Sequence, residues 1–221
     1  MMSEKPMTDK KDLSDYRRDY ESQGMRKADL DSDPVNQFGR WLQDANDLKL
    51  IDSTAMTLAT STPSGMPSAR IVLLKGYDER GFCWYSDSRS QKGQELSLNP
   101  QASLLFHWRD LSRQVRVQGI VETLPAGDAE TYFNSRPEGS RFSAASSCQT
   151  STVENRQALE NEVERLHELY PNGDVPRPKS WIGYRLKPHY FEFWQGLVNR
   201  LHDRVSYRPD GSHWTMTRLS P

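Results

Sequence analysis

Two stretches of the sequence concentrate cationic side chains, and each could bind an anion. The stretch Arg200-Leu201-His202-Asp203-Arg204 holds three potential cations within five residues. In an extended strand side chains alternate, so Arg200, His202 and Arg204 would share one face, with Leu201 and Asp203 on the other. Like charges at that spacing repel one another unless an anion or carboxylates lie among them. The alternative is a solvated edge strand whose charges discourage pairing with another sheet.

The second stretch, Arg70-Ile71-Val72-Leu73-Leu74-Lys75, is an apolar strand bracketed by two cations that alternation places on opposite faces. Further donors follow in Tyr132, Arg136 and Ser140, on a predicted helix end and the loop after it. An arginine fork, a lysine and two hydroxyls could together surround a phosphate without a glycine-rich loop. The alternative is that Tyr132 packs in the core, Arg136 ends a helix and Lys75 is a solvated strand end.

Other site chemistries have weaker support in the sequence. The aromatic residues of two predicted adjacent strands are mostly core, although one or two could flank a planar ring. These aromatic residues are Trp181, Tyr190, Phe191, Phe193 and Trp194. The five histidines show no paired ligand spacing, so we expect no metal site. The GxSxG sequence of many serine hydrolases is also absent.

The elements that must position these residues are mainly strands. Asp33-Pro34 predicts the start of an amphipathic helix that reaches Leu48. Short β-rich segments with turn residues between several of them then favour an antiparallel barrel or sandwich. The predicted strands are 54–60, 69–76, 82–86, 102–108, 114–123, 181–187, 190–194 and 214–219.

Helices are expected around this β core. Residues 125–135 predict a short helix, and Ser151 with Glu154 forms a capping-box pattern ahead of a helix that reaches about Tyr170. The Ser-rich residues 136–150 between them are expected to be flexible. Residues 1–32 are strongly polar and predict a mobile arm, and 33–221 predict one domain. The expected class is mainly β with peripheral helices.

Composition limits the partners. Lys and Arg total 29 against 30 Asp and Glu, a net charge of −1, so neither nucleic acid nor a membrane surface is an expected partner. Two cysteines without CxxC spacing favour a reducing compartment. The first residues lack the apolar run of a secretory leader, so a cytoplasmic location is expected.

Several motifs, taken together and in order, resemble the pyridoxine/pyridoxamine 5′-phosphate oxidase family. They are Arg70 to Lys75, Arg113-Gln-Val, Tyr132-Phe-Asn-Ser-Arg-Pro137, Phe193-Trp-Gln-Gly196 and Arg200 to Arg204. The resemblance runs from about Tyr16 to Pro221. It implies an FMN-binding split β-barrel with Greek-key-like connections, assembled as a homodimer with flavin at the subunit interface.

The resemblance also implies roles for individual residues. Substrate phosphate would be held by Lys75, Tyr132, Arg136 and Ser140, and the pyridine ring by Arg200 and His202 beside Leu201. In the predicted arm, Arg17, Arg18, Asp19 and Tyr20 resemble the family segment that folds over the substrate. FMN would be contacted by Arg70, Ile71, Val72, Leu73, Leu74, Lys75, Tyr85, Ser86, Gln91, Lys92, Gln114, Gln149, Thr150, Trp194 and Arg204.

One departure concerns the FMN phosphate. Gln91-Lys92 stands where the family usually has Arg-Lys, so a neutral amide replaces an expected cation and predicts weaker FMN retention. The loop 141–148 is also unusual, which weakens the assignment of Gln149 and Thr150.

The implied reaction is oxidation of pyridoxine and pyridoxamine 5′-phosphates at C4′ by hydride transfer to flavin, with O2 as the final acceptor and H2O2 released. Arg200 would position the substrate, and His202 would support its polar groups or accept a proton. Two alternatives stay open: a related split-barrel flavoprotein with another substrate, and a non-catalytic binder of pyridoxal phosphate.

Overall fold

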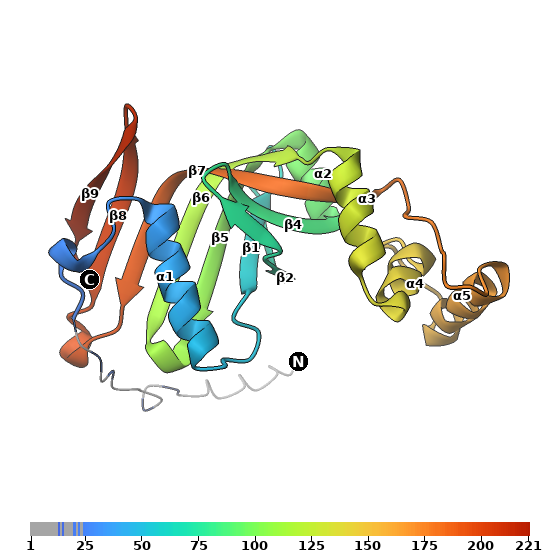
Figure 1. The fold of residues 1–221 in the computed structure, drawn as a ribbon, viewed down its shortest axis with the longest axis horizontal. Coiled ribbons are helices and arrows are strands. Elements are labelled where there is room, and N and C mark those ends of the chain that lie inside the picture. The colour runs from blue at the N-terminus through green and yellow to red at the C-terminus, as the bar shows by residue number, and fades with distance from the viewer. Residues whose placement is uncertain (1–12, 14, 16–19, 21, 23) are drawn as a thin grey trace, which may run out of the picture.

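The computed structural model describes Leu13, Asp15, Tyr20, Ser22 and residues 24–221. These residues form one nine-stranded sheet, in which every pair of neighbouring strands is antiparallel, together with five α-helices (Figure 1). The strands are β1 (Ala55–Ser61), β2 (Pro67–Leu73), β3 (Gly76–Asp78), β4 (Gly81–Asp87), β5 (Gln101–Trp108), β6 (Arg113–Thr123), β7 (Trp181–Gln195), β8 (Asp203–Asp210) and β9 (His213–Leu219). The helices are α1 (Pro34–Asp47), α2 (Gln91–Leu98), α3 (Ala126–Ser135), α4 (Glu138–Ser146) and α5 (Arg156–Leu169).

The long strand β7 connects the two ends of the sheet. The strand order is β2-β1-β5-β6-β7-β4-β3, and β8 and β9 continue from β7. Residues 181–186 of β7 pair with β4, whereas residues 191–195 pair with β8. Pro188 lies between these halves, where the register with β6 shifts, because proline has no N–H for the ladder. The two strands predicted at 181–187 and 190–194 are therefore halves of one strand, and the mainly-β antiparallel class is confirmed.

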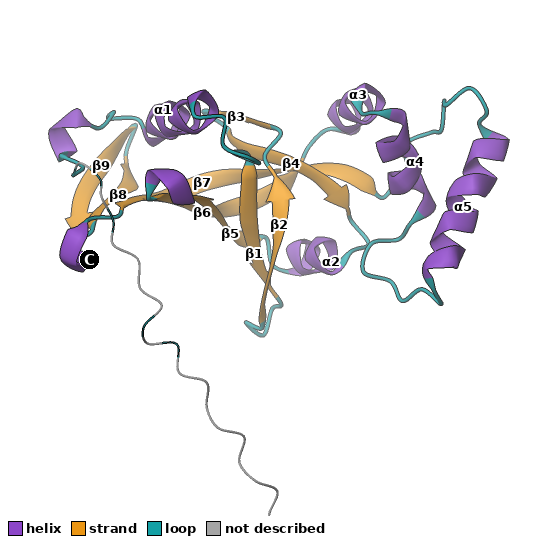
Figure 2. Ribbon diagram, turned by 90° about the horizontal axis from the view of Figure 1, so that it is seen from below, coloured by secondary structure: helices purple, strands orange, loops and turns teal. Residues whose placement is uncertain are grey.

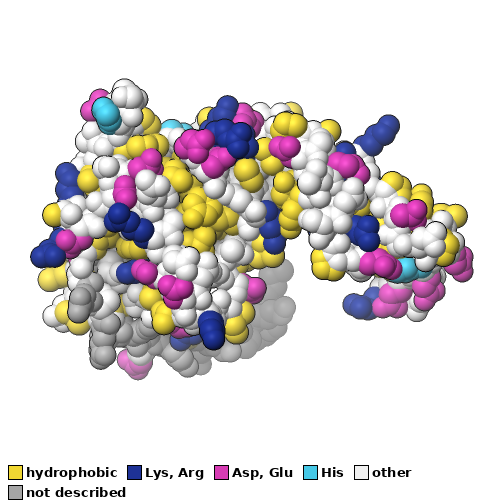
Figure 3. All heavy atoms as spheres, in the orientation of Figure 1, with side chains coloured by type: hydrophobic (Ala, Val, Ile, Leu, Met, Phe, Trp, Pro, Cys, Tyr) yellow, Lys and Arg dark blue, Asp and Glu magenta, His cyan; other side chains and the backbone are white. Residues whose placement is uncertain are grey.

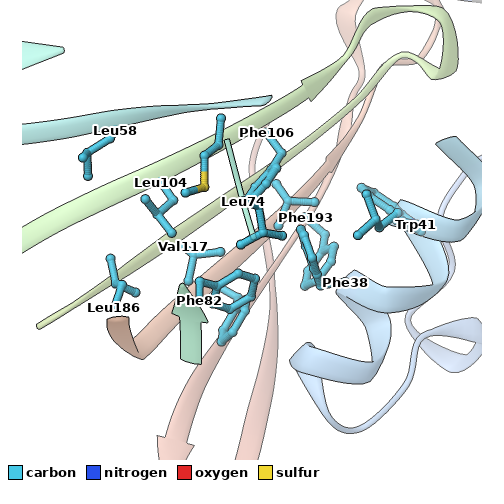
Figure 4. Close-up of a cluster of buried hydrophobic side chains, with 14 of the residues drawn as sticks. Phe38, Trp41, Leu58, Leu74, Phe82, Leu104, Phe106, Val117, Leu186 and Phe193 are labelled. Atoms are coloured by element: carbon cyan, nitrogen blue, oxygen red, sulfur yellow. The ribbon is translucent and has the colours of Figure 1, made fainter. Parts of the chain in front are cut away.

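The helix α1 covers one face of the sheet and closes the core. The Asp33 side chain accepts hydrogen bonds from the N–H groups of Val35 and Asn36, which confirms the predicted N-cap. Figure 4 shows Phe38 and Trp41 directed from α1 toward side chains of the sheet. The Phe38 ring centroid lies 4.8 Å from that of Phe106, and both side chains are fully buried. Burial of each such side chain stabilises the fold by roughly 1.5–3 kcal/mol.

The helix α3 packs against the end of β7, with the ring centroids of Phe133 and Trp181 5.2 Å apart, and α4 and α5 form a small unit beyond that end of the sheet (Figure 2). The predicted capping box is wrong, because the Asn155 side chain caps α5 by accepting from the N–H of Ala158. The stretch 136–150, expected to be flexible, contains α4. Its buried Phe142 packs with Leu166 and Val175 in a separate apolar cluster. The short helix α2 has no counterpart among the predicted elements.

The last part of the predicted arm is attached to the opposite end of the sheet. Met25 is buried, and its N–H donates to Asp203 Oδ2 at 2.7 Å. Tyr207 Oη donates to the carbonyl oxygen of Asp31 at 2.9 Å. Arg17, Arg18 and Asp19 lie outside the described residues.

The surface carries charges of both signs. In the face drawn in Figure 3, Lys and Arg side chains are interspersed with Asp and Glu rather than gathered in one broad field. Within the described part of the chain, no helix is both long enough and apolar enough to cross a membrane.

Candidate functional site

A cavity of about 310 Å³ brings residues of β2 and β4 together with residues of α2 and α3. It is lined by Arg70, Ile71, Val72, Leu73, Lys75, Tyr85, Ser86, Lys92, Tyr132, Arg136, Gln149 and Trp181. All but Trp181 are residues that the sequence analysis assigns to cofactor or substrate. Trp181 was recognised there only as one aromatic residue of a predicted strand.

The charge of this cavity is one-sided. Its lining includes Arg70, Lys75, Lys92 and Arg136, but no aspartate or glutamate. Four cations that converge on one cavity favour an anionic ligand, because their mutual repulsion is relieved when negative charge enters. Among the described residues, no group of three or more His, Cys, Asp or Glu side chains is placed to hold a metal ion.

Arg136 is the cation with an unsatisfied donor. Its Nη1 is buried and makes no hydrogen bond to the described residues. The guanidinium carbon lies 4.9 Å from the ring centroid of Trp181, a cation–π distance. Burial lowers the pKa of Arg136 below its ordinary value. A buried charged donor without an acceptor is costly, so an acceptor that reached Nη1 would stabilise this group.

Lys92 extends from the first turn of α2 into the same cavity. Its Nζ donates to Gln149 Oε1 at 2.9 Å and to Ser90 Oγ at 3.1 Å. Ser86 Oγ donates to the same oxygen of Gln149 at 3.1 Å. Burial, and next the nearby charge of Arg70, lower the pKa of Lys92. A ligand anion would offset both effects.

Polar side chains and one carboxylate hold the guanidinium of Arg70 in place. It donates to Thr60 Oγ1 and Ser68 Oγ, both at 2.6 Å, and lies 3.6 Å from the buried carboxylate of Glu95. Gln91 also donates to Glu95, at 2.9 Å. Gln91 does not line the cavity, and it is exposed at the start of α2.

Flat aromatic rings form another wall of the cavity. The rings of Tyr85 and Tyr132 are 4.2 Å apart between centroids and 17° from parallel. Trp181 is inclined by only 8° to Tyr85, at 5.4 Å. Tyr132 therefore packs against aromatic neighbours, as the core-packing alternative predicts. It also lines the cavity, as the phosphate-binding interpretation predicts. Nearly parallel rings beside several cations suit a planar, anionic ligand.

Some predicted residues lie outside this cavity. The Leu74 side chain is buried in the core, as Figure 4 shows, so only its backbone could contact a cofactor. Ser140 lies in the first turn of α4 and does not contribute to the lining. Thr150 is exposed, and its Oγ1 accepts from the N–H of Gln91 at 3.3 Å.

A second group of predicted residues lies where β6, β7 and β8 are paired. In the strand register Gln114 is opposite Trp194, and Trp194 is opposite Arg204. The described Tyr20 makes edge-on contacts with Trp194 and His202, with centroid distances of 5.6 Å and 5.3 Å. The side chains of Trp194 and Arg204 are only half-buried.

The prediction of one extended strand from Arg200 to Arg204 is wrong. Val198–Arg200 form a 3₁₀ turn, and β8 begins at Asp203. Asn199 and Arg200 have φ values of +53° and +60°, in the left-handed region that side chains rarely adopt. Arg200 and Leu201 are exposed at this turn, so the three potential cations do not share a strand face.

His202 follows the turn in a defined orientation. Its Nδ1 accepts a hydrogen bond from the N–H of Leu197 at 3.0 Å, and its ring lies 4.7 Å from that of Trp194. Burial, and next the charge of Arg200, lower the pKa of His202. The neutral ring that accepts at Nδ1 carries its proton on Nε2, so the free edge of His202 is a hydrogen-bond donor.

The two groups are separated within one chain. Figures 1 and 2 both place β8 at one end of the sheet and α3 at the other. The residues assigned to the cofactor are accordingly divided between the cavity beside α3 and a second group beside β8, which consists of Gln114, Trp194 and Arg204.

Comparison with known proteins matches nearly the whole chain to models of related oxidase families. Residues 42–170 match the family model described as pyridoxamine 5′-phosphate oxidase. Residues 181–221 match the model described as the pyridoxine 5′-phosphate oxidase C-terminal dimerisation region. A pyridoxine/pyridoxamine 5′-phosphate oxidase of Ralstonia pickettii is 50% identical over 212 residues, which cover 95% of this chain and 99% of the relative.

Two solved structures are similar as well. PhzG from Burkholderia lata, in complex with tetrahydrophenazine-1-carboxylic acid, is 31% identical with a TM-score of 0.86 and covers 92% of this chain and 100% of its own. A pyridoxamine 5′-phosphate oxidase-related, FMN-binding protein from Nostoc punctiforme has a TM-score of 0.68 at 15% identity. That likeness covers 87% of this chain and 100% of the other and concerns the fold alone.

Proposed function

The chain belongs to the pyridoxamine 5′-phosphate oxidase family, and from that premise we propose that it oxidises pyridoxine and pyridoxamine 5′-phosphates to pyridoxal 5′-phosphate. Oxygen accepts the two electrons and leaves as H2O2. The alcohol loses two hydrogens, whereas the amine also takes up water and releases ammonia. The observation that carries this proposal is the cavity in which four cations, without a carboxylate, border a stack of aromatic rings.

The residues of the cavity fit FMN. Lys92 and Arg70 are cations that would face its phosphate, and the orphaned donor of Arg136 shows that the cavity as a whole needs an anion. Ser86 and Gln149 supply polar groups beside Lys92. FMN supplies the redox chemistry by accepting a hydride from the substrate, and the protein supplies orientation and charge.

Lys75, Tyr132 and Arg136 would bind the substrate phosphate. All three line the cavity, where Lys75 provides a point charge, Tyr132 a hydroxyl and Arg136 a fork with an unused donor. Ser140 would join them only if a ligand reaches the first turn of α4. A substrate with a phosphate would use these cations more fully than one with a single carboxylate.

A complete site would require two copies of the chain. Trp194, Arg200, His202 and Arg204 lie at the end of the sheet opposite to α3 (Figure 1). We propose a homodimer in which this end of one copy covers the cavity of the other. The dimerisation model matched at 181–221 spans these residues. The exposed Ile71 and Leu73 of the edge strand β2 are the apolar surface that a second copy would cover.

The residues of the second copy would orient the substrate over the flavin. The exposed side chain of Arg200 is free of the sheet and could reach a bound pyridine ring. His202, neutral with its proton on Nε2, would donate a hydrogen bond to a polar group of that ring rather than take up a proton. Tyr20, which contacts His202, would close the site from the arm.

The decisive experiment combines a spectrum with an assay. The purified full-length chain should show flavin absorbance and release peroxide with both phosphorylated vitamers, but not with unphosphorylated pyridoxine. A colourless protein that cannot take up FMN would overturn the proposal. A yellow protein inactive on both phosphates would indicate another substrate, and pyridoxal phosphate binding without peroxide release would indicate a binding protein.

The shared site has its own test. Lys75→Met removes a cation of the cavity and Arg200→Leu removes a cation of the covering end, so each homodimer should lose most turnover. Random mixing of the two inactive chains should restore about a quarter of wild-type activity, because half the dimers contain one intact site. An inactive mixture, with mixed dimers present by mass spectrometry, would contradict a site shared between copies.

A further inference from the structure

Glu192 is a buried carboxylate in the middle of β7 that the reaction described above does not use. Its exposed fraction is only 4%, on the strand face opposite to the fully buried Phe191 and Phe193. Burial of a carboxylate among apolar groups is costly unless its oxygens are fully paired. The carboxylate therefore needs partners from the adjacent strands.

Both oxygens of Glu192 are paired. Oε2 accepts from Arg116 Nη2 at 2.5 Å on β6 and from Tyr190 Oη at 3.0 Å. Oε1 accepts from Arg204 Nε on β8 at 2.9 Å, and Arg204 Nη2 lies 2.8 Å from the same oxygen as an ion pair. One carboxylate thus links two arginines across three strands.

The orientation of Arg204 follows from this pairing. A guanidinium has five N–H groups. The Nε–H donates to Glu192, one N–H of Nη2 lies on the same edge in ion-pair contact with Glu192, and one N–H of Nη1 donates to the carbonyl oxygen of Ser220 at 3.0 Å. The side chain remains 30% exposed. Two N–H groups are therefore left for a ligand, and the direction in which they point is fixed by Glu192.

The charge of the cluster also favours an anion. Arg116 and Arg204 contribute two positive charges against the single negative charge of Glu192. Arg208 adds another cation, 4.7 Å from the ring centroid of Tyr190. A buried ion pair stabilises a fold no better than well-packed apolar residues do, so stability alone does not explain the carboxylate.

We propose that Glu192 is a positioning residue for the cofactor: it holds Arg204 so that its two unused N–H groups face the flavin in the shared site. The inference rests on the proposed function. It concerns FMN affinity, which is measured without turnover.

The test is a double-mutant cycle read out as the Kd for FMN, by quenching of flavin fluorescence on the full-length apoprotein. Glu192→Gln removes the charge that fixes Arg204 and should raise the Kd about tenfold, because the freed side chain must be ordered again on binding. Arg204→Met should raise the Kd at least as much. The combination of both changes should match Arg204→Met within about twofold, since Glu192 acts through Arg204.

The matched control is Glu122→Gln on β6. Glu122 also pairs with two cations, Lys187 at 2.6 Å and Arg185 at 3.5 Å, but Arg185 lies in the half of β7 that pairs with β4 and Lys187 directly follows that half. Its loss should leave the Kd for FMN within about twofold of wild type. Thermal unfolding of each variant shows how much stability is lost, and mass measurement reports the dimer.

Each outcome bears on the inference. An unchanged Kd in folded Glu192→Gln would overturn it. If that single variant does not fold, the double variant decides, because removal of both partners leaves no unpaired guanidinium at position 204. A double variant that binds FMN at least five times more weakly than Arg204→Met would mean that Glu192 does not act through Arg204. Wild-type protein that binds FMN but oxidises neither vitamer phosphate would refute the proposed function. The double-mutant cycle would still test the role of Glu192, because it measures only the Kd for FMN.

Discussion

Replacement of Arg136 by methionine separates the cost of an unpaired buried charge from its use in binding. The variant keeps an unbranched apolar stem and removes the guanidinium whose Nη1 has no partner among the described residues. Loss of the contact with Trp181 costs roughly 0.5–2 kcal/mol. Removal of a buried donor that has no partner stabilises the folded state by roughly 1–3 kcal/mol. The free energy of unfolding without ligand should therefore change by between a loss of about 1 kcal/mol and a gain of about 2.5 kcal/mol.

Substrate binding should respond much more strongly. A hydrogen bond to a charged group contributes roughly 1.5–3 kcal/mol, and 1.4 kcal/mol corresponds to a factor of ten. Arg136→Met should therefore raise KM for pyridoxine 5′-phosphate about 10- to 100-fold. Steady-state peroxide assays measure KM, and thermal unfolding without substrate measures stability.

Arg177 provides the matched control because it contacts the same tryptophan but has hydrogen-bond partners for both Nε and Nη1. It donates to Glu130 at 2.8 Å and to the carbonyl oxygen of Trp181 at 2.6 Å. Arg177→Met should lose roughly 1–3 kcal/mol of stability, which is about 2–10 °C in Tm, with little change in KM. If Arg136→Met is the less stable variant and keeps wild-type KM, Arg136 is a structural residue and the reasoning fails.

Two further predictions concern residues near the cofactor and the substrate. Gln91→Arg adds a cation at the start of α2, so we expect its Kd for FMN to fall several-fold. Fluorescence titration measures this, and an unchanged Kd would mean that the new arginine pairs with Glu95, to which Gln91 now donates. The second concerns pH: His202 has a pKa below its ordinary value in the folded chain, so protonation favours the unfolded state. Folded-state stability should therefore fall as the pH drops through about 6.5, and His202→Gln should flatten the Tm profile between about pH 7.5 and 5.5. Parallel profiles for the two proteins would show that His202 does not contribute to this loss.

The sequence predicts most of the sheet because alternation reports directly on burial. In β6, for example, Val115 and Val117 are fully buried, whereas Arg116 between them is half exposed. Each strand from β1 to β6, except the three-residue β3, lies within a few residues of a predicted segment. A helix such as α1 is equally predictable, because its N-cap residue marks its start and its periodic apolar residues mark its buried face.

The elements that were missed depend on distant contacts. The helix α4 buries only Phe142, and its partners Leu166 and Val175 follow more than twenty residues later in the chain. A Ser-rich segment with one buried side chain gives no periodic signal. The helix α2 also lacks a clear periodic signal, because its buried carboxylate Glu95 contacts the polar side chains of Thr60, Ser68 and Arg70 rather than apolar ones.

The candidate site shows why residue types are easier to predict than their arrangement. Arg200, His202 and Arg204 were grouped on the assumption of an extended backbone, which the positive φ values of Asn199 and Arg200 interrupt. Only Arg204 lies in a strand, and its place opposite Trp194 follows from the register between β7 and β8. That register depends on residues far along the chain, so local spacing could not supply it. The same pairing brings Arg204 to Glu192, and no sequence pattern connects that buried charge with a cofactor site. Because Trp194 and Arg204 beside β8 and the cavity beside α3 lie at opposite ends of one sheet, the proposed site that combines them would need a second copy of the chain.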